Sequence, residues 1–262
     1  MKKSLLLLMV VLLTFALVAI AFGIPINNVT GTKHNLSSAG GGSYKAIAGN
    51  EDQICVFCHT PHQAEGFSTD PLWNHSNSTH AGTYNVYSST TLNATVGAGA
   101  IAAILGNGTA LSNLCMSCHD GTQAINSLYN PSNDLGGNPT MTAFGDTITT
   151  NANIGTDLSN DHPVNFTYDD ALAQADGGLV LPSSATSACY DGGTSNYAVS
   201  IGQFQSDYAG SSLAQKLVPG NQFQCSSCHG AHIYYGGTQS GYSPFLKVNN
   251  VGSGLCLSCH CK

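Results

Sequence analysis

The chain opens with one long apolar run and then turns polar and irregular. Leu5–Phe22 is uncharged and largely apolar, and two lysines precede it. Beyond this run, no stretch keeps helical periodicity for more than about three turns. Residues 169–175 and 211–217 have the spacing of brief amphipathic helices, and residues 84–91 suit a short strand. The pattern predicts turns, short helices and few short strands.

The first 23 residues have the layout of an export signal. Lys2 and Lys3 form a basic start, the apolar run follows, and Ala21-Phe22-Gly23 offers small residues for cleavage before Ile24. We therefore expect a mature chain of residues 24–262 that has no membrane span and is secreted, to the cell surface or beyond it. A retained membrane anchor is the alternative, because about 18 apolar residues are just enough to cross a bilayer.

The long segment at about 120–224 is rich in Gly, Asn, Thr and Asp. Turn dipeptides recur along it, among them Asn138-Pro139 and Pro219-Gly220. Since no long amphipathic element interrupts these turns, we expect a single domain over 24–262 that carries a polar insert, rather than two domains.

Charge is scarce in this sequence. Only 8% of the residues are charged, none is arginine, and the net charge is −7. Loss of Lys2 and Lys3 would leave 14 acidic residues against 5 lysines, a net charge of −9. This composition argues against nucleic-acid binding, which needs clustered basic residues to neutralise phosphates. Seven Asn-x-Ser/Thr triplets would make an exported chain a candidate glycoprotein; they begin at Asn28, Asn35, Asn74, Asn77, Asn93, Asn107 and Asn165.

One motif, Cys-x-x-Cys-His, occurs four times. Its cysteines are Cys55 and Cys58, Cys115 and Cys118, Cys225 and Cys228, and Cys256 and Cys259, followed by His59, His119, His229 and His260. This is the attachment signature of c-type haem. Two thiols on one turn form thioethers to the haem vinyl groups, and the adjacent histidine binds the iron as the proximal ligand. Zinc binding and disulfides also use Cys-x-x-Cys, but neither requires histidine at the next position. The motifs predict a tetrahaem c-type cytochrome.

Six further histidines are available as distal ligands of the four irons: His34, His62, His75, His80, His162 and His232. Methionine is the competing distal ligand, and Met141 is the only plausible candidate outside the signal and the motifs. We therefore expect four covalent haems with two histidines each. Such irons have no open position, which favours electron transfer over catalysis.

The spacing of the spare histidines suggests which haem each one serves. His62 and His232 each follow a proximal histidine by three residues, too close to reach the opposite face of the same porphyrin, so each should bind a different haem. His232 and the fourth motif are the natural pair, because the third and fourth motifs are close in sequence. His162 precedes a proline, which favours extended backbone, and we assign it to the second haem.

The first haem has two candidate distal ligands, His34 and His75, of which we favour His34. His80 lies among small polar residues and is expected to be a solvated loop histidine.

Two cysteines, Cys189 and Cys261, lie outside the motifs. An exported compartment tolerates disulfides, so a bridge between them is expected; two free or intermolecular thiols are the alternative.

Four stretches carry a family resemblance: residues 54–62, which end in Cys-His-Thr-Pro-His, residues 71–75, 115–121 and 162–164. With four haem motifs, the last at the C-terminus, the chain resembles the tetrahaem extracellular cytochrome nanowires of the OmcE type, relatives of the hexahaem OmcS filaments. The resemblance is weak in the Gly/Asn-rich insert. It implies a multihaem cytochrome c fold, organised around a stacked haem chain, whose identical subunits polymerise into a filament.

In such filaments a histidine just after the first motif leaves its own subunit and binds a haem near the end of its neighbour. The matching position here is His62. Since His34, His162 and His232 are assigned elsewhere, the third haem is the one left for His62. The expected function is long-range extracellular electron transfer, to other redox proteins or extracellular acceptors. The alternative is a soluble or anchored tetrahaem electron carrier.

Overall fold

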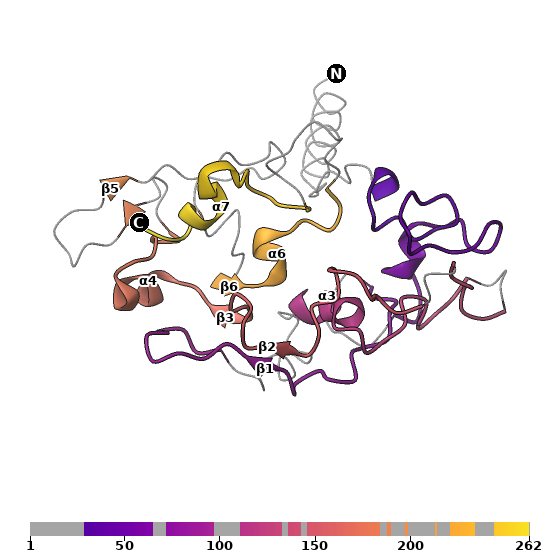
Figure 1. Cartoon of the computed structure of the whole chain (residues 1–262), viewed down its shortest axis with the longest axis horizontal. Helices are drawn as coiled ribbons and strands as arrows, with labels where there is room; N and C mark the ends of the chain where they lie inside the picture. Colours follow the sequence, from indigo (N-terminus) through magenta and orange to yellow (C-terminus); the bar gives the residue numbers. More distant parts are fainter. Residues whose placement is uncertain are drawn as a thin grey trace, which may run out of the picture.

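The computed structural model describes residues 29–64, 72–96, 111–132, 136–142, 146–183, 188–189, 197–198, 213, 221–233 and 244–261. The molecule is longer than it is wide, and the four Cys-x-x-Cys-His segments follow one another along its length in sequence order (Figure 1). The first lies among the indigo residues at one end, and α7 and the C-terminus lie toward the other. The candidate haem sites therefore form a row.

Each motif begins on a short helical turn. These turns are η2 (Cys55–Phe57), α3 (Leu111–His119), α6 (Cys225–Cys228) and α7 (Gly254–Leu257). In three of the motifs the histidine N–H bonds to the carbonyl of the first cysteine, at 2.8 to 3.0 Å. One turn thus places both thiols and the histidine of a motif close together, which thioether attachment of a haem requires.

The other helical segments are equally short: η1 (Val29–Gly31), η6 (Val251–Ser253) and α4 (Asp170–Asp176). The Asp169 side chain caps the start of α4 by accepting a hydrogen bond from the Leu172 N–H. Gly177 ends the helix with φ 72°, a left-handed conformation that glycine adopts without a steric penalty. The short helix expected at 169–175 is therefore present.

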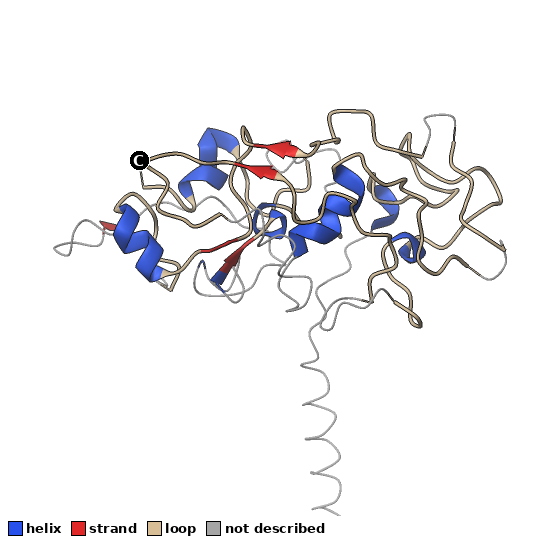
Figure 2. Cartoon of the chain, turned by 90° about the horizontal axis from the view of Figure 1, so that it is seen from below, coloured by secondary structure: helices blue, strands red, loops and turns tan. Residues whose placement is uncertain are grey.

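Strands are few and two residues long. β1 (Asn85–Val86) pairs in parallel with β2 (Asp157–Leu158), β3 (Phe166–Thr167) pairs antiparallel with β6 (Gln222–Phe223), and β4 (Ala188–Cys189) pairs antiparallel with β5 (Tyr197–Ala198). β1 falls within the strand expected at 84–91. Loops make up most of the described chain (Figure 2), as the sequence pattern predicted. The helix expected at 211–217 lies outside the described residues, except for Leu213.

The apolar core is divided along the row of motifs. One cluster, built from Tyr168, Ala173, Val180, Leu213, Phe223 and Val248, packs against cysteines of the third and fourth motifs. A second, built from Ala46, Val56, Phe57, Ile125, Leu128, Met141 and Ile148, packs against Cys58 and Cys118. A third, smaller cluster joins Tyr84, Met116 and Leu158. Many of these residues belong to 120–224, so the segment expected to be a polar insert supplies core to both ends of the molecule.

The N-terminal segment expected to be an export signal, 1–23, lies outside the described residues. Within the part of the chain that is described, no helix has the length and apolar character needed to cross a membrane.

Candidate haem sites

Three of the four motif histidines face a second histidine that comes from a distant part of the chain. Ring centres are 6.0 Å apart for His59 and His232, 6.1 Å for His34 and His119, and 6.3 Å for His162 and His260. Every pair joins one motif histidine to one histidine outside the motifs. This separation of roles is what proximal and distal ligands of one iron require.

The ring separation has a simple physical reading. A histidine nitrogen binds a transition metal at about 2.0–2.1 Å, so two imidazoles on opposite sides of one iron have ring centres roughly 6 Å apart. Ordinary aromatic contacts cover about 4.5–7 Å, so one such pair would say little. Three pairs with closely similar separations, each with one motif member, fit iron ligation better than chance packing.

Ring hydrogen bonds leave the correct nitrogen for the metal. Nδ1 of His34 lies 3.1 Å from the Ala231 carbonyl oxygen, and that of His119 lies 2.7 Å from Ala152 O. Nδ1 of His162 and of His229 have equivalent carbonyl partners, at 2.8 and 3.0 Å. A carbonyl accepts a hydrogen bond from Nδ1–H and so fixes the tautomer in which Nε2 carries the lone pair that binds iron.

Burial works in the same direction. It lowers the pKa of His34, His229 and His232 below the usual histidine range, mainly because a charged imidazole is poorly solvated there. A lowered pKa favours the neutral imidazole, which is the form that binds a metal.

His75 and His80 have different surroundings. His75 is fully buried, with Nδ1 2.9 Å from Ser76 O and Nε2 2.8 Å from Ala124 O. Both ring nitrogens thus lie at backbone carbonyls, which favours His34 over His75 as a distal ligand. His80 is exposed, and its Nδ1 lies 3.4 Å from the Thr79 hydroxyl.

The structure pairs the rings differently from the assignment made on sequence spacing. His34 faces the second motif rather than the first, His232 faces the first rather than the fourth, and His162 faces the fourth rather than the second. Sequence position does not determine these pairs, because a chain this irregular brings its segments together through long-range contacts. The set of residues, His34, His162 and His232, is unchanged.

The third motif is the exception. All ten histidines lie in the described residues, yet no second histidine ring lies opposite His229. Three histidines outside the motifs are not paired with a motif ring: His75 is buried, whereas His62 and His80 are exposed. His62 is the one of the two exposed histidines that closely follows a motif. Its side chain is exposed, but its backbone carbonyl accepts hydrogen bonds from the Thr60 hydroxyl, at 2.9 Å, and from Asn130 Nδ2, at 3.0 Å. The ring is thus presented to solvent from a fixed backbone.

Thiols of successive motifs lie near enough to influence one another's pKa. The interaction between the Cys115 and Cys225 thiols raises the pKa of Cys115 and lowers that of Cys225. The thiols of Cys58 and Cys118 interact electrostatically. Those of Cys228 and Cys259 do so as well. The first site thus adjoins the second, the second the third, and the third the fourth.

Histidines that meet in pairs suit a haem iron, which is already held by four porphyrin nitrogens and takes one further ligand on each face. Among the described residues, no three His, Cys, Asp or Glu side chains gather into a cluster that could hold a metal ion. Trp73 Nε1 is buried without a hydrogen-bond partner beside the His59 ring. A haem propionate is an acceptor that would satisfy this donor. Trp73 was not among the candidate residues identified from the sequence.

The remaining candidates from the sequence are Met141 and the two cysteines outside the motifs. Met141 lies in the buried core cluster that touches Cys58 and Cys118, near two sites that already have a histidine pair. Cys261 is disulfide-bonded, whereas the eight motif cysteines are free thiols. The side chain of Cys189 lies outside the described residues, so its bridge to Cys261 stays a prediction.

The glycosylation triplets differ in accessibility. Asn35, Asn74 and Asn165 are buried, and Asn77 is partly buried. Asn93 is exposed, with Nδ2 3.3 Å from Asp176 Oδ2. The triplets at Asn28 and Asn107 lie outside the described residues.

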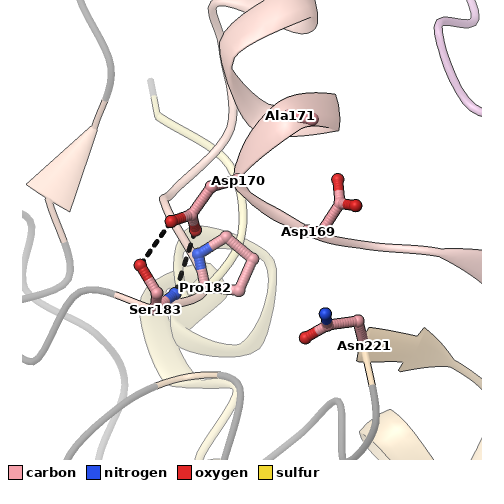
Figure 3. A pocket seen from close by; sticks show the side chains of 6 residues that line it. All are labelled: Asp169, Asp170, Ala171, Pro182, Ser183 and Asn221. Carbon is pink, nitrogen blue, oxygen red and sulfur yellow. Dashed lines mark hydrogen bonds between the residues drawn. The ribbon is translucent and has the colours of Figure 1, made fainter.

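Away from the motifs, a hollow is lined by Asp169, Asp170, Ala171, Pro182, Ser183 and Asn221 (Figure 3). Asp169 caps α4, and Asp170 accepts hydrogen bonds from the Ser183 N–H and hydroxyl. Asp169 therefore stabilises the start of α4, and Asp170 holds α4 to Ser183.

No protein-family model and no curated protein sequence matches this chain. The arrangement of its histidines and thiols therefore carries the functional argument. What sequence reasoning missed most are the backbone carbonyls of Ala152, Ala231 and Pro244, which orient the rings. No sequence signal marks them, because every residue has a carbonyl and only the fold decides which one meets a histidine.

Proposed function

We propose that this protein is a tetrahaem c-type cytochrome that polymerises head-to-tail into an extracellular filament and conducts electrons along it. The observation that carries the proposal is the unequal pairing of the histidines: three motif rings have a histidine opposite them, and the His229 ring has none. Two exposed histidines remain, His62 and His80, and of these only His62 lies within three residues of a motif. His62 of one subunit binds the third haem, held by Cys225, Cys228 and His229, of the next.

Each part of the chain has a defined role in this function. Haem, when bound, supplies an iron that accepts and donates single electrons. The cysteines of each motif fix the porphyrin, and the paired histidines hold its iron from both sides and exclude substrate. Thiols of neighbouring motifs, such as Cys115 and Cys225, lie near enough to shift each other's pKa, and this proximity supports the close haem spacing that electron transfer along the row needs.

The head-to-tail contact explains polymerisation. His62 lies with the first motif, and its target lies two motifs further along the row, so donor and acceptor surfaces are different patches of the subunit. A contact of this kind is heterologous, and it gives an open filament when its rotation does not close a ring.

Electron microscopy of the secreted protein, with wild type compared with His62→Ala and His80→Ala, tests the proposal. Wild type and His80→Ala should form filaments with four six-coordinate haems per subunit. His62→Ala should remain monomeric, with four covalent haems, one of them high-spin. Normal filaments of His62→Ala with four six-coordinate haems would refute the proposed ligand, and a wild-type monomer with all four haems six-coordinate would establish the carrier alternative.

A further inference from the structure

The first and third motifs lie in two modules with the same backbone plan. The first module is residues 55–62 with 72–74, and the third module is residues 225–232 with 245–247. Each contains Cys-x-x-Cys-His-x-x-His. In each, the motif histidine forms an isolated β-bridge to a later segment, His59 to Trp73 and His229 to Leu246.

The hydrogen bonds around the two bridges correspond one to one. Thr60 N–H donates to Leu72 O at 2.9 Å, and Gly230 N–H donates to Phe245 O at 2.8 Å. On the other side of each bridge, Asn74 N–H donates to Cys58 O and Lys247 N–H to Cys228 O, both at 2.9 Å. The two modules therefore pair their segments in the same register.

The two modules also share an unusual backbone conformation. Leu72 and Phe245, which occupy equivalent positions, both have φ 56°. Bulky residues rarely adopt this left-handed conformation, so its occurrence at matching positions argues for one repeated structure. Leu72 is thus the counterpart of Phe245, as His62 is the counterpart of His232.

The contacts of the third module are made within the subunit. His232 lies opposite His59, two sites back along the row, and Phe245 stacks on the ring of His34, with centres 4.5 Å apart and an angle of 15° between planes. His34 serves the second site, one site back. The third module therefore supplies a ligand two sites back and an apolar cover one site back.

The first module has no earlier sites within its own subunit. In a head-to-tail filament, the site one back is the fourth site of the preceding subunit, and the site two back is the third. The proposed function, on which this inference rests, assigns His62 to that third site. The fourth site contains His162, which is exposed.

We propose that the junction between subunits repeats the contact that the third module makes with the first two sites inside one subunit. At this junction, Leu72 of one subunit covers His162 of the preceding subunit, as Phe245 covers His34 within the chain. This accounts for two features that a lone subunit does not explain. Leu72 is 52% exposed although it is a large apolar residue held in a rare conformation, and His162 is exposed although it faces a motif histidine.

The experiment compares filament assembly of Leu72→Asp, Leu72→Ala, Leu72→Phe and His62→Ala, by sedimentation and electron microscopy. Ile154→Asp is the matched control, since Ile154 is 43% exposed and pairs its backbone with His119 in the middle of the row. Leu72→Asp should raise the protein concentration needed for assembly by about tenfold or more, and Leu72→Ala by less. Leu72→Phe, which copies the third module, should assemble like wild type or better, and Ile154→Asp should assemble like wild type.

The outcomes separate this inference from the proposed function. If His62→Ala fails to assemble while Leu72→Asp and Leu72→Ala assemble like wild type, the His62 ligand stands and the proposed cover is wrong. If His62→Ala assembles normally, the proposed function itself fails. Haem content and spin state of each variant monomer show whether it has folded, and Leu72→Ala and Leu72→Phe keep the test decisive if Leu72→Asp does not fold.

Discussion

The first and third modules have one backbone plan and different exposure. In the third, His232 and Phe245 are partly buried against rings of the same chain. In the first, His62 and Leu72 occupy the equivalent positions and are exposed. In the proposed filament, a subunit contact arises by repetition: the contact made inside the chain at the third module is left open at the first, and a second copy of the chain completes it.

The largest expected effect separates the two equivalent histidines. His232→Ala should leave the first haem without its distal ligand and lower the stability of the subunit by at least about 2 kcal/mol, because the lost ligation also holds distant segments together. His62→Ala should change subunit stability by no more than about 0.5 kcal/mol, because its ring is exposed. Chemical denaturation of the two monomers measures the difference. Equal losses of stability would mean that His62 is also used within the subunit.

A second contrast between the two modules lies in the residues that follow the bridged Trp73 and Leu246, which are Asn74 and Lys247. Asn74 is buried, its Nδ2 donates to Val56 O at 2.6 Å and to Asn130 O at 3.0 Å, and its Oδ1 accepts from Asn130 N–H at 2.8 Å. Asn74→Ala should cost about 2–4 kcal/mol, since it leaves buried backbone groups without partners. Because Asn130 also holds the His62 carbonyl, assembly should weaken as well. Denaturation and sedimentation of Asn74→Ala test both effects, and wild-type stability would contradict the first.

The counterpart of Asn74 in the third module is Lys247. Burial lowers the pKa of Lys247 to about 8. Between this pH and the ordinary lysine range, the unfolded chain holds the proton more often than the folded chain, so stability due to this group rises with pH, by at most about 1.4 kcal/mol per unit. Lys247→Met should remove this slope and leave stability at pH 7 unchanged or higher by roughly 1 kcal/mol. Stability measured from pH 7 to 10.5 decides the point, and an unchanged slope would exclude Lys247 as its source.

The smallest effect concerns glycosylation, where the first module again supplies the contrast. Asn74 is a triplet asparagine with both amide atoms engaged inside the fold, whereas Asn93 is exposed. In a host that glycosylates exported proteins, we expect a glycan on Asn93 and none on Asn74. Peptide mass spectrometry checks this, and Asn93→Gln should remove the glycan without changing assembly. A glycan on Asn74 in assembled filaments would contradict the buried amide.

Much of the local structure could be predicted from the sequence. The four motifs, the short helix after Asp169 and the short strand near Tyr84 each depend on residues a few positions apart, so local chemistry is sufficient to indicate them. The role of residues 120–224 was harder to predict. Their Gly and Asn content suggested a polar insert outside the core, yet Met141, Tyr168 and Phe223 are buried in the core clusters. Apolar residues too widely spaced for a regular helix or strand leave no periodic signal.

The sequence by itself determined which residues are candidates for haem attachment and iron ligation, because a Cys-x-x-Cys-His turn brings its own thiols and imidazole together. The tertiary structure alone decided which distant histidine faces which motif: His34 faces His119, His162 faces His260 and His232 faces His59. The physical reason is that pairing depends on long-range contacts such as the hydrogen bond between His34 and the Ala231 carbonyl. A backbone carbonyl has no residue identity, so the sequence carries no mark of the contact that positions the ring.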